Sequence, residues 1–259
     1  MADLCHDIRG NGPVLLVVPG GAGHPMGLDA LTADLAGHFT VVTYDPLGLA
    51  HGRLGLPVAE QRVEAWSDGA RRVLDEVLPD GESAYVLGFS SGGIAVLDLL
   101  ARHPERLRHV IAHEPPVVRV LSDAERQSAM FAEVYDTYRT AGLAAAGARL
   151  AAGLAGTPAT PPESGQPLSA EEELSSPMAL FLTRVLTRFT AYLPDLDALR
   201  PAPLTLAAGA DSRGGPLHRT ASVAAELTGS RFAEFPGGHL GAAEHPREFA
   251  ANVLAALRG

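Results

Sequence analysis

The sequence predicts an α/β fold: a mostly parallel, twisted sheet with helices on both faces and one helical insertion. Short, uniformly apolar runs alternate along the chain with amphipathic stretches, and strands that are buried on both faces of a parallel sheet have this appearance. The chain has 259 residues, of which 46% are hydrophobic, enough to bury a large core. The alternation stops after residue 116 and resumes near residue 201, which indicates the insertion.

The strands are predicted where apolar runs end in residues that favour turns. These runs are Val14–Val18, Phe39–Tyr44, Ala84–Phe89, Val110–Ala112, Leu204–Ala208 and Arg231–Phe235. A further strand around Leu4–Ile8 is expected as an antiparallel edge. Helical periodicity between the strands predicts helices at Leu28–Gly37, Arg62–Leu78, Gly92–Arg102, Ala221–Thr228 and Pro246–Leu257.

Residues 117–200 carry no strand signal, and we expect them to form a helical cap over the edge of the sheet where the strands end. Helices are predicted at Asp123–Thr140, Leu143–Leu154 and Pro177–Tyr192. The segment "GTPATPPESGQPLSAEEELSSP" lies between the last two and is rich in Pro, Ser, Thr and Glu, a composition typical of a mobile loop. Residues 1–116 and 201–259 then form the core domain.

Charge and composition exclude several functional classes. The net charge is −10, so we expect no nucleic-acid partner. All twenty basic residues are arginine, which removes lysine-based covalent chemistry. The single cysteine, Cys5, excludes an intrachain disulfide and a cysteine-rich metal site. No signal peptide or membrane span is recognisable, so we expect a cytoplasmic protein with no membrane partner, no metal and no cofactor, and we leave a homodimer open.

The segment "VLGFSSGG" predicts a nucleophilic serine. Gly88, Ser90 and Gly92 form the pattern G-x-S-x-G directly after a predicted strand and directly before a predicted helix. A serine on such a tight strand-to-helix turn projects out of the sheet, and the helix N-terminus behind it favours developing negative charge. A Gly/Ser turn without chemistry is the alternative, but the strand and the helix on either side favour the nucleophile.

The segment "VVPGGAGH" predicts donors for an oxyanion. It places a glycine-rich loop after the first long strand, where acyl-transfer enzymes of this architecture hold one backbone donor. We assign the donors to the N–H groups of Gly21 and Ser91. A phosphate-binding loop is disfavoured, because a Walker-type loop needs a lysine and the glycine spacing differs from the dinucleotide fingerprint.

The general base is expected late in the chain. "FPGGHLG" places His239 in a glycine-flanked loop after the last predicted strand and before the final helix. His24 and His113 are expected to face the site but not in the position of the base.

Two carboxylates compete to orient this histidine. Glu114, in "HVIAHEPPVV", stands at the exit of an apolar strand, where a carboxylate is costly unless its charge is used. Asp211, in "LAAGADSRGG", follows the next-to-last predicted strand. It comes one residue earlier than the common G-x-x-D spacing, although a loop could absorb that shift. We favour Glu114 and keep Asp211 as the alternative.

These segments resemble the α/β-hydrolase superfamily over essentially the whole chain, with nucleophile, acid and histidine in that chain order. "GFSSGG", "HPERLRHVIAHEPP" and "FPGGHLGAAEHPREFA" further resemble the zearalenone-type lactone hydrolases. In those enzymes a glutamate at the position of Glu114 orients the histidine. The resemblance is much less specific in the early strands and in the insertion.

The resemblance implies a serine hydrolase of the carboxylesterase or lactonase type (EC 3.1.1) that acts on a small-molecule ester or lactone. A thioesterase, C–C bond hydrolase, cofactor-free haloperoxidase, acyl transferase or cyclase would show the same residues, and a non-catalytic ligand-binding protein is a further alternative. An epoxide hydrolase or dehalogenase is disfavoured, because those enzymes have a carboxylate where Ser90 stands. We predict that the substrate contacts Gly20, Ala22, His24, His113, Met130, Phe131, Tyr135, Phe181, Phe189 and Leu240. The apolar residues of the insertion among them, together with Leu180 and Leu186, are as typical of ordinary core.

Overall fold

The computed structural model describes residues 5–23, 27–46, 49, 56, 58, 60–158, 165–200 and 202–258. Seven strands form one sheet in the order β1-β3-β2-β4-β5-β6-β7. They are β1 (Cys5–Gly10), β2 (Val14–Val18), β3 (Thr40–Asp45), β4 (Ala84–Phe89), β5 (Leu107–His113), β6 (Leu204–Gly209) and β7 (Arg231–Phe235). The edge strand β1 is antiparallel to β3, and every other pair is parallel. The predicted fold class is therefore confirmed.

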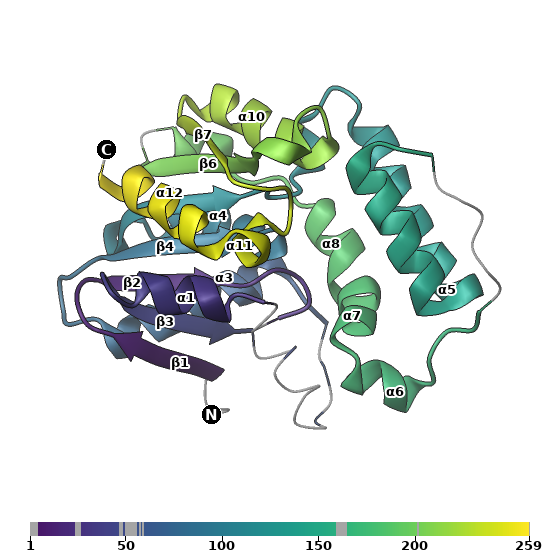
Figure 1. Ribbon diagram of the computed structural model, residues 1–259, viewed down its shortest axis with the longest axis horizontal. Helices are drawn as coiled ribbons and strands as arrows, with labels where there is room; N and C mark the ends of the chain where they lie inside the picture. The colour runs from purple at the N-terminus through teal and green to yellow at the C-terminus, as the bar shows by residue number, and fades with distance from the viewer. Residues whose placement is uncertain are drawn as a thin grey trace.

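Helices cover both faces of the sheet, as Figure 1 shows. Helices α1 (Asp29–Leu35) and α12 (Pro246–Arg258) pack on one face, in an apolar cluster that includes Leu15, Ile111 and Phe249. Helices α3 (Val63–Val77), α4 (Ser91–Arg102) and α10 (Pro216–Thr228) pack on the other. The short helix α11 (Gly241–Glu244) precedes α12. Both faces of the central strands are buried, which is why their sequences are uniformly apolar.

The segment between β5 and β6 is helical, and Figure 1 shows most of it beside one end of the sheet, away from both chain termini. Its helices are α5 (Ala124–Ala155), α6 (Ala170–Ser175), α7 (Pro177–Leu180), α8 (Leu186–Thr190) and α9 (Leu196–Leu199), with a π-helical turn at Phe181–Val185. Helix α5 is interrupted at Gly142, whose φ of 81° breaks the helical path. Two helices were expected there, and the break separates them.

Two local expectations need correction. The segment expected to be a mobile loop contains α6, because Ser169 and Glu172 form a reciprocal capping box at its start; residues 159–164 of that segment lie outside the described residues. Helix α10 begins at Pro216, five residues before the expected start, since proline suits the first turn of a helix. No helix in the described part of the chain has the length and apolar character needed to cross a bilayer.

Candidate active site

Ser90 lies on a sharp turn at the end of the central strand β4. Its φ of 51° and ψ of −119° are unfavourable for a residue with a side chain. Glycines make the turn possible. A Cβ at Gly88 would come within 2.6 Å of Val96 Cγ2 and 2.7 Å of the Gly92 carbonyl oxygen, and one at Gly92 would overlap the carbonyl oxygen of Pro19. The G-x-S-x-G pattern therefore holds Ser90 half-buried at the sheet edge.

The close approach of Gly92 to Pro19 brings the glycine-rich loop against the first turn of α4. The first N–H groups of a helix have no acceptor within it, so the Ser91 N–H at the start of α4 is available to an anion. A Cβ at Gly21 would come 3.1 Å from Ser91 Oγ and would overlap the ring of Phe181. Gly20 and Gly21 are buried beside the same turn.

His239 and Glu114 form a direct contact. His239 Nδ1 lies 2.7 Å from Glu114 Oε2, and the second carboxylate oxygen accepts the Gly209 N–H at 3.0 Å. The Glu114 side chain is completely buried, whereas the His239 side chain is 27% exposed. Glu114 adopts a left-handed φ of 46°, a conformation that a non-glycine residue keeps only where its surroundings require it.

Backbone pairing places these groups at neighbouring strand ends. The Ser90 N–H donates to the His113 carbonyl oxygen at 2.9 Å, and the Glu114 N–H donates to the Ala207 carbonyl oxygen at 2.8 Å. The loop before His239 then packs on the end of β6, because a Cβ at Gly209 would come within 2.5 Å of the Gly237 carbonyl oxygen. This close approach brings His239 within reach of a side chain from β5.

The surroundings of Glu114 favour its charged form. Burial raises the pKa of the carboxyl, but the hydrogen bond with His239, the neighbouring histidines and a hydrogen bond with Ser212 together outweigh burial and lower it to about 2. A carboxylate in this state accepts a proton-bearing Nδ1, which leaves His239 Nε2 unprotonated when the ring is neutral.

Asp211 occupies a different position. It lies exposed on the turn Ala210–Ser212, where its backbone N–H donates to the Gly237 carbonyl oxygen at 2.9 Å. No described residue makes a hydrogen bond with its carboxylate. Of the two candidate carboxylates, the structure brings Glu114 to His239 and leaves Asp211 at the surface.

A small pocket contains both Ser90 and His239. It offers about 40 Å³ to water-sized molecules. Its other described lining residues are Gly20, Leu28, Phe89, Leu240, Ala242 and Ala243. Gly20 and Leu240 were predicted as substrate contacts. Leu28, Phe89, Ala242 and Ala243 were missed, because small and apolar residues at the ends of elements carry no signal that separates a pocket wall from core.

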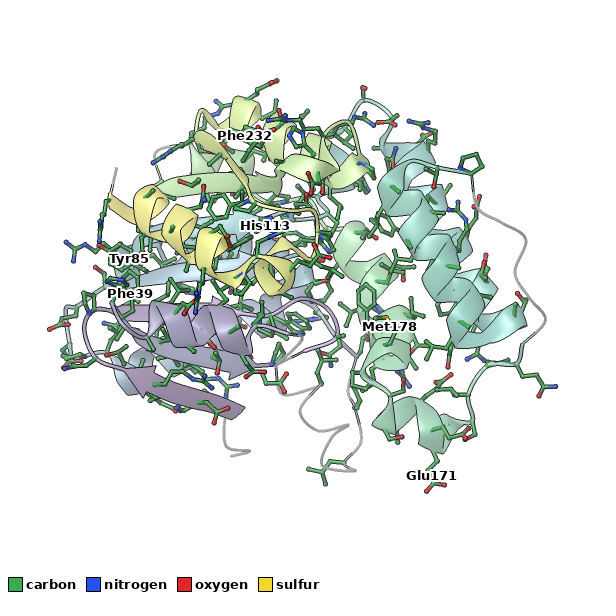
Figure 2. All side chains as sticks on the ribbon, viewed as in Figure 1. Phe39, Tyr85, His113, Glu171, Met178 and Phe232 are labelled. Carbon is green, nitrogen blue, oxygen red and sulfur yellow. The ribbon has the colours of Figure 1, made fainter. Side chains whose placement is uncertain are left out.

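His113 is buried behind this pocket and does not line it. Its ring packs among Phe89, Phe235 and Phe249, with centroids 5.1 to 6.1 Å away, and Figure 2 shows it in the interior. Neither ring nitrogen has a hydrogen-bond partner among the described residues. Burial lowers the pKa of the imidazole to about 4, although the Glu114 charge opposes this shift. His113 is therefore a neutral interior residue.

The predicted contacts from the insertion are mostly placed elsewhere. Phe189 packs on Trp66 at 4.7 Å in the core, while Met130 and Phe131 belong to an apolar cluster inside the insertion. Tyr135 is half-buried on α5 and does not line the pocket. These side chains were predicted from apolar helix faces, and an apolar face does not show whether it meets a ligand or another helix.

Two predicted contacts remain near the site, and one cannot be placed. Phe181, on the π-helical turn, lies against Gly21. Ala22 lines a separate small cavity with Asp45 and Leu180. His24 lies outside the described residues.

Within the described residues, no group of three or more His, Cys, Asp or Glu side chains is placed to hold a metal ion. The arrangement at the pocket instead combines a hydroxyl, an imidazole held by a carboxylate, and free backbone N–H groups. Such a set of groups can transfer a proton from an attacking hydroxyl and stabilise an oxyanion.

The family model for the alpha/beta hydrolase fold matches residues 13–246. The chain belongs to this family. An uncharacterised hydrolase of Bacillus subtilis, YraK, is 31% identical over 255 residues, which cover 96% of this chain and 90% of the relative. The protein is thus similar to a hydrolase over nearly its full length.

Two further proteins are similar. A zearalenone hydrolase of Bionectria ochroleuca is 32% identical over 114 residues, covering 43% of this chain and 42% of the relative. The enol-lactonase of Burkholderia xenovorans has a similar structure, with a TM-score of 0.68, 17% identity, and coverage of 99% of this chain and 96% of that one. At that identity the structural likeness shows the fold alone.

Proposed function

We propose that the protein is a serine hydrolase that cleaves a carboxylic ester or lactone without a cofactor. One observation carries the proposal: Ser90 and His239 line the same pocket, and His239 Nδ1 lies 2.7 Å from the buried Glu114 carboxylate. The relatives named as a zearalenone hydrolase and an enol-lactonase support lactones as candidate substrates.

In the proposed reaction Ser90 Oγ attacks the carbonyl carbon while His239 Nε2 takes the hydroxyl proton. Glu114 holds the imidazole in the tautomer that leaves Nε2 free, and it stabilises the imidazolium that forms. The Gly21 and Ser91 N–H groups hold the oxyanion. His239 then returns its proton to the leaving oxygen as the C–O bond breaks, which leaves Ser90 acylated.

Deacylation repeats these steps with water. His239 takes a proton from the water, the hydroxide adds to the acyl carbon, and collapse of the intermediate returns the proton to Ser90. A simple ester gives an acid and an alcohol, whereas a lactone gives one hydroxy acid. The leaving group, not the catalytic residues, distinguishes an ester from a thioester, so both belong in the test.

The test is a panel of esters, lactones (zearalenone among them) and thioesters, assayed with wild-type protein and with Ser90→Ala. We expect hydrolysis of at least one ester or lactone and a loss of about 10³-fold or more in Ser90→Ala. A matched control is Ser175→Ala, at the end of α6. Equal activity of wild type and Ser90→Ala would contradict the proposal, and cleavage of thioesters alone would select the thioesterase alternative.

A further inference from the structure

The pocket at Ser90 is apolar everywhere except at the two reacting side chains. Its other described lining residues are aliphatic, aromatic or glycine. Leu240, which follows His239, is 57% exposed at the pocket, and a large apolar side chain so exposed beside an apolar pocket is typical of a binding site. These properties favour an uncharged apolar group next to the reacting carbonyl.

The walls of this pocket come from the core domain. Leu28 is the residue before α1, and Ala242 and Ala243 belong to α11. No described residue of the insertion lines it. The group that it receives is therefore selected by α1 and α11, whereas the insertion contacts the site through Phe181, which lies against Gly21 on the oxyanion side.

Alanine side chains limit the depth of the pocket. Ala242 is 3% exposed and packs into the core, so its position is fixed. Ala243 is exposed on α11 and faces the chain before α1: a Cβ added at Gly27 would come 3.1 Å from the Ala243 Cβ. The gap between α11 and this chain is thus narrow, and the side chain at position 243 determines how much of it is filled.

The available volume sets a size limit. The pocket offers about 40 Å³ to the centres of water-sized molecules, and one water needs roughly 10–15 Å³ by this measure. The space holds about three such molecules, and hence about three non-hydrogen atoms of a substrate arm.

We propose that this pocket is a subsite for one short apolar arm of the ester, and that Ala243 is a residue that determines its specificity. The inference rests on the proposed function, because it assumes that Ser90 attacks an ester carbonyl. It adds the substrate class: esters or lactones with about three apolar atoms on one side of the carboxyl group, and no such limit on the other.

Two ester series test the proposal, each measured as kcat/KM. One series lengthens the acyl chain from acetate to octanoate at a fixed alcohol, and the other lengthens the alcohol from methyl to octyl at a fixed acid. For wild type we expect kcat/KM to fall beyond about three or four carbons in one series only. Ala243→Leu should reduce kcat/KM for three-carbon arms in that series by about tenfold or more and leave one-carbon arms within about twofold. Ala243→Gly should move the fall toward longer arms.

The control is Ala251→Leu, the same substitution at an exposed position of α12. Melting temperatures show whether each variant folds. An unchanged length profile in Ala243→Leu, or equal losses in both series, would overturn the subsite while leaving the hydrolase intact. Absence of any ester or lactone hydrolysis by wild type would overturn the proposed function and the subsite with it.

Discussion

The ends of β5 and β6 lie side by side, yet they treat their carboxylates in opposite ways. At the end of β5, Glu114 is completely buried, has a left-handed φ, and is bonded through both oxygens. At the end of β6, Asp211 is exposed on a short turn and takes part only through its backbone N–H. The strand that precedes an acid in the chain does not decide which acid reaches the histidine.

The backbone around Gly209 explains the difference. The histidine loop packs so closely on Gly209 that a side chain there would clash, and the Gly209 N–H is thereby directed to Glu114. The turn that follows carries Asp211 past the histidine loop and out to solvent. A glutamate is long enough to reach His239 from the neighbouring strand.

The largest effect is expected from exchanging the charges of these two residues. Glu114→Gln keeps the size of the side chain but removes the charge that fixes the His239 tautomer, so kcat for ester hydrolysis should fall by about 10³- to 10⁴-fold. Asp211→Asn should change kcat by less than about tenfold. Steady-state kinetics on one ester measures both, with melting temperatures as the folding control. The reverse ranking would assign the role to Asp211.

A smaller effect concerns the stability of the same strand end. The pKa of His113 falls to about 4 in the folded protein, below its ordinary value of 6.5, so the folded state resists protonation. Its contribution is complete above pH 6.5 and is lost as the pH falls from 6.5 to 4. Between pH 7.5 and 5.0, wild type should lose about 2 kcal/mol more unfolding free energy than His113→Leu.

Urea unfolding at the two pH values measures this difference. The other histidines titrate in both proteins, so their contributions cancel in the comparison. His113→Leu should also be more stable at pH 7.5, since the leucine leaves no buried ring nitrogen without a partner. Equal losses in the two proteins would mean that His113 is not held in its neutral form.

The smallest effect is expected at Ser212, which follows Asp211 on the β6 turn and donates a hydrogen bond to Glu114. In Ser212→Ala the carboxylate keeps the Gly209 N–H and His239 as partners. We therefore expect kcat to fall by about tenfold or less, because only one of several interactions with the charge is removed. A fall of 100-fold or more in steady-state kinetics would show that the β6 turn contributes more to the acid than Gly209 does.

The sequence predicted the features that local patterns determine. The strands, the turn at Ser90 and the loop of His239 follow from apolar runs, glycines and their order. The choice between Glu114 and Asp211 depends on the approach of Gly209 to the histidine loop. That contact joins positions far apart in the chain, and no local pattern encodes it.

The insertion was harder to predict for a related reason. Its apolar faces were visible, but Met130 and Phe189 turned out to pack against other apolar side chains. The pocket walls instead include two alanines of α11, whose small side chains leave the space open. An empty volume is a property of packing in three dimensions, and composition does not report it.

The most direct test of the account is covalent labelling of the nucleophile. A fluorophosphonate reacts with a serine activated by a neighbouring base, and mass spectrometry of the labelled protein and its peptides identifies the residue. We expect one adduct per chain, on Ser90, with labelling slowed about 10³-fold in Glu114→Gln and little changed in Asp211→Asn. No adduct on wild-type protein, or equal labelling of wild type and Ser90→Ala, would contradict it.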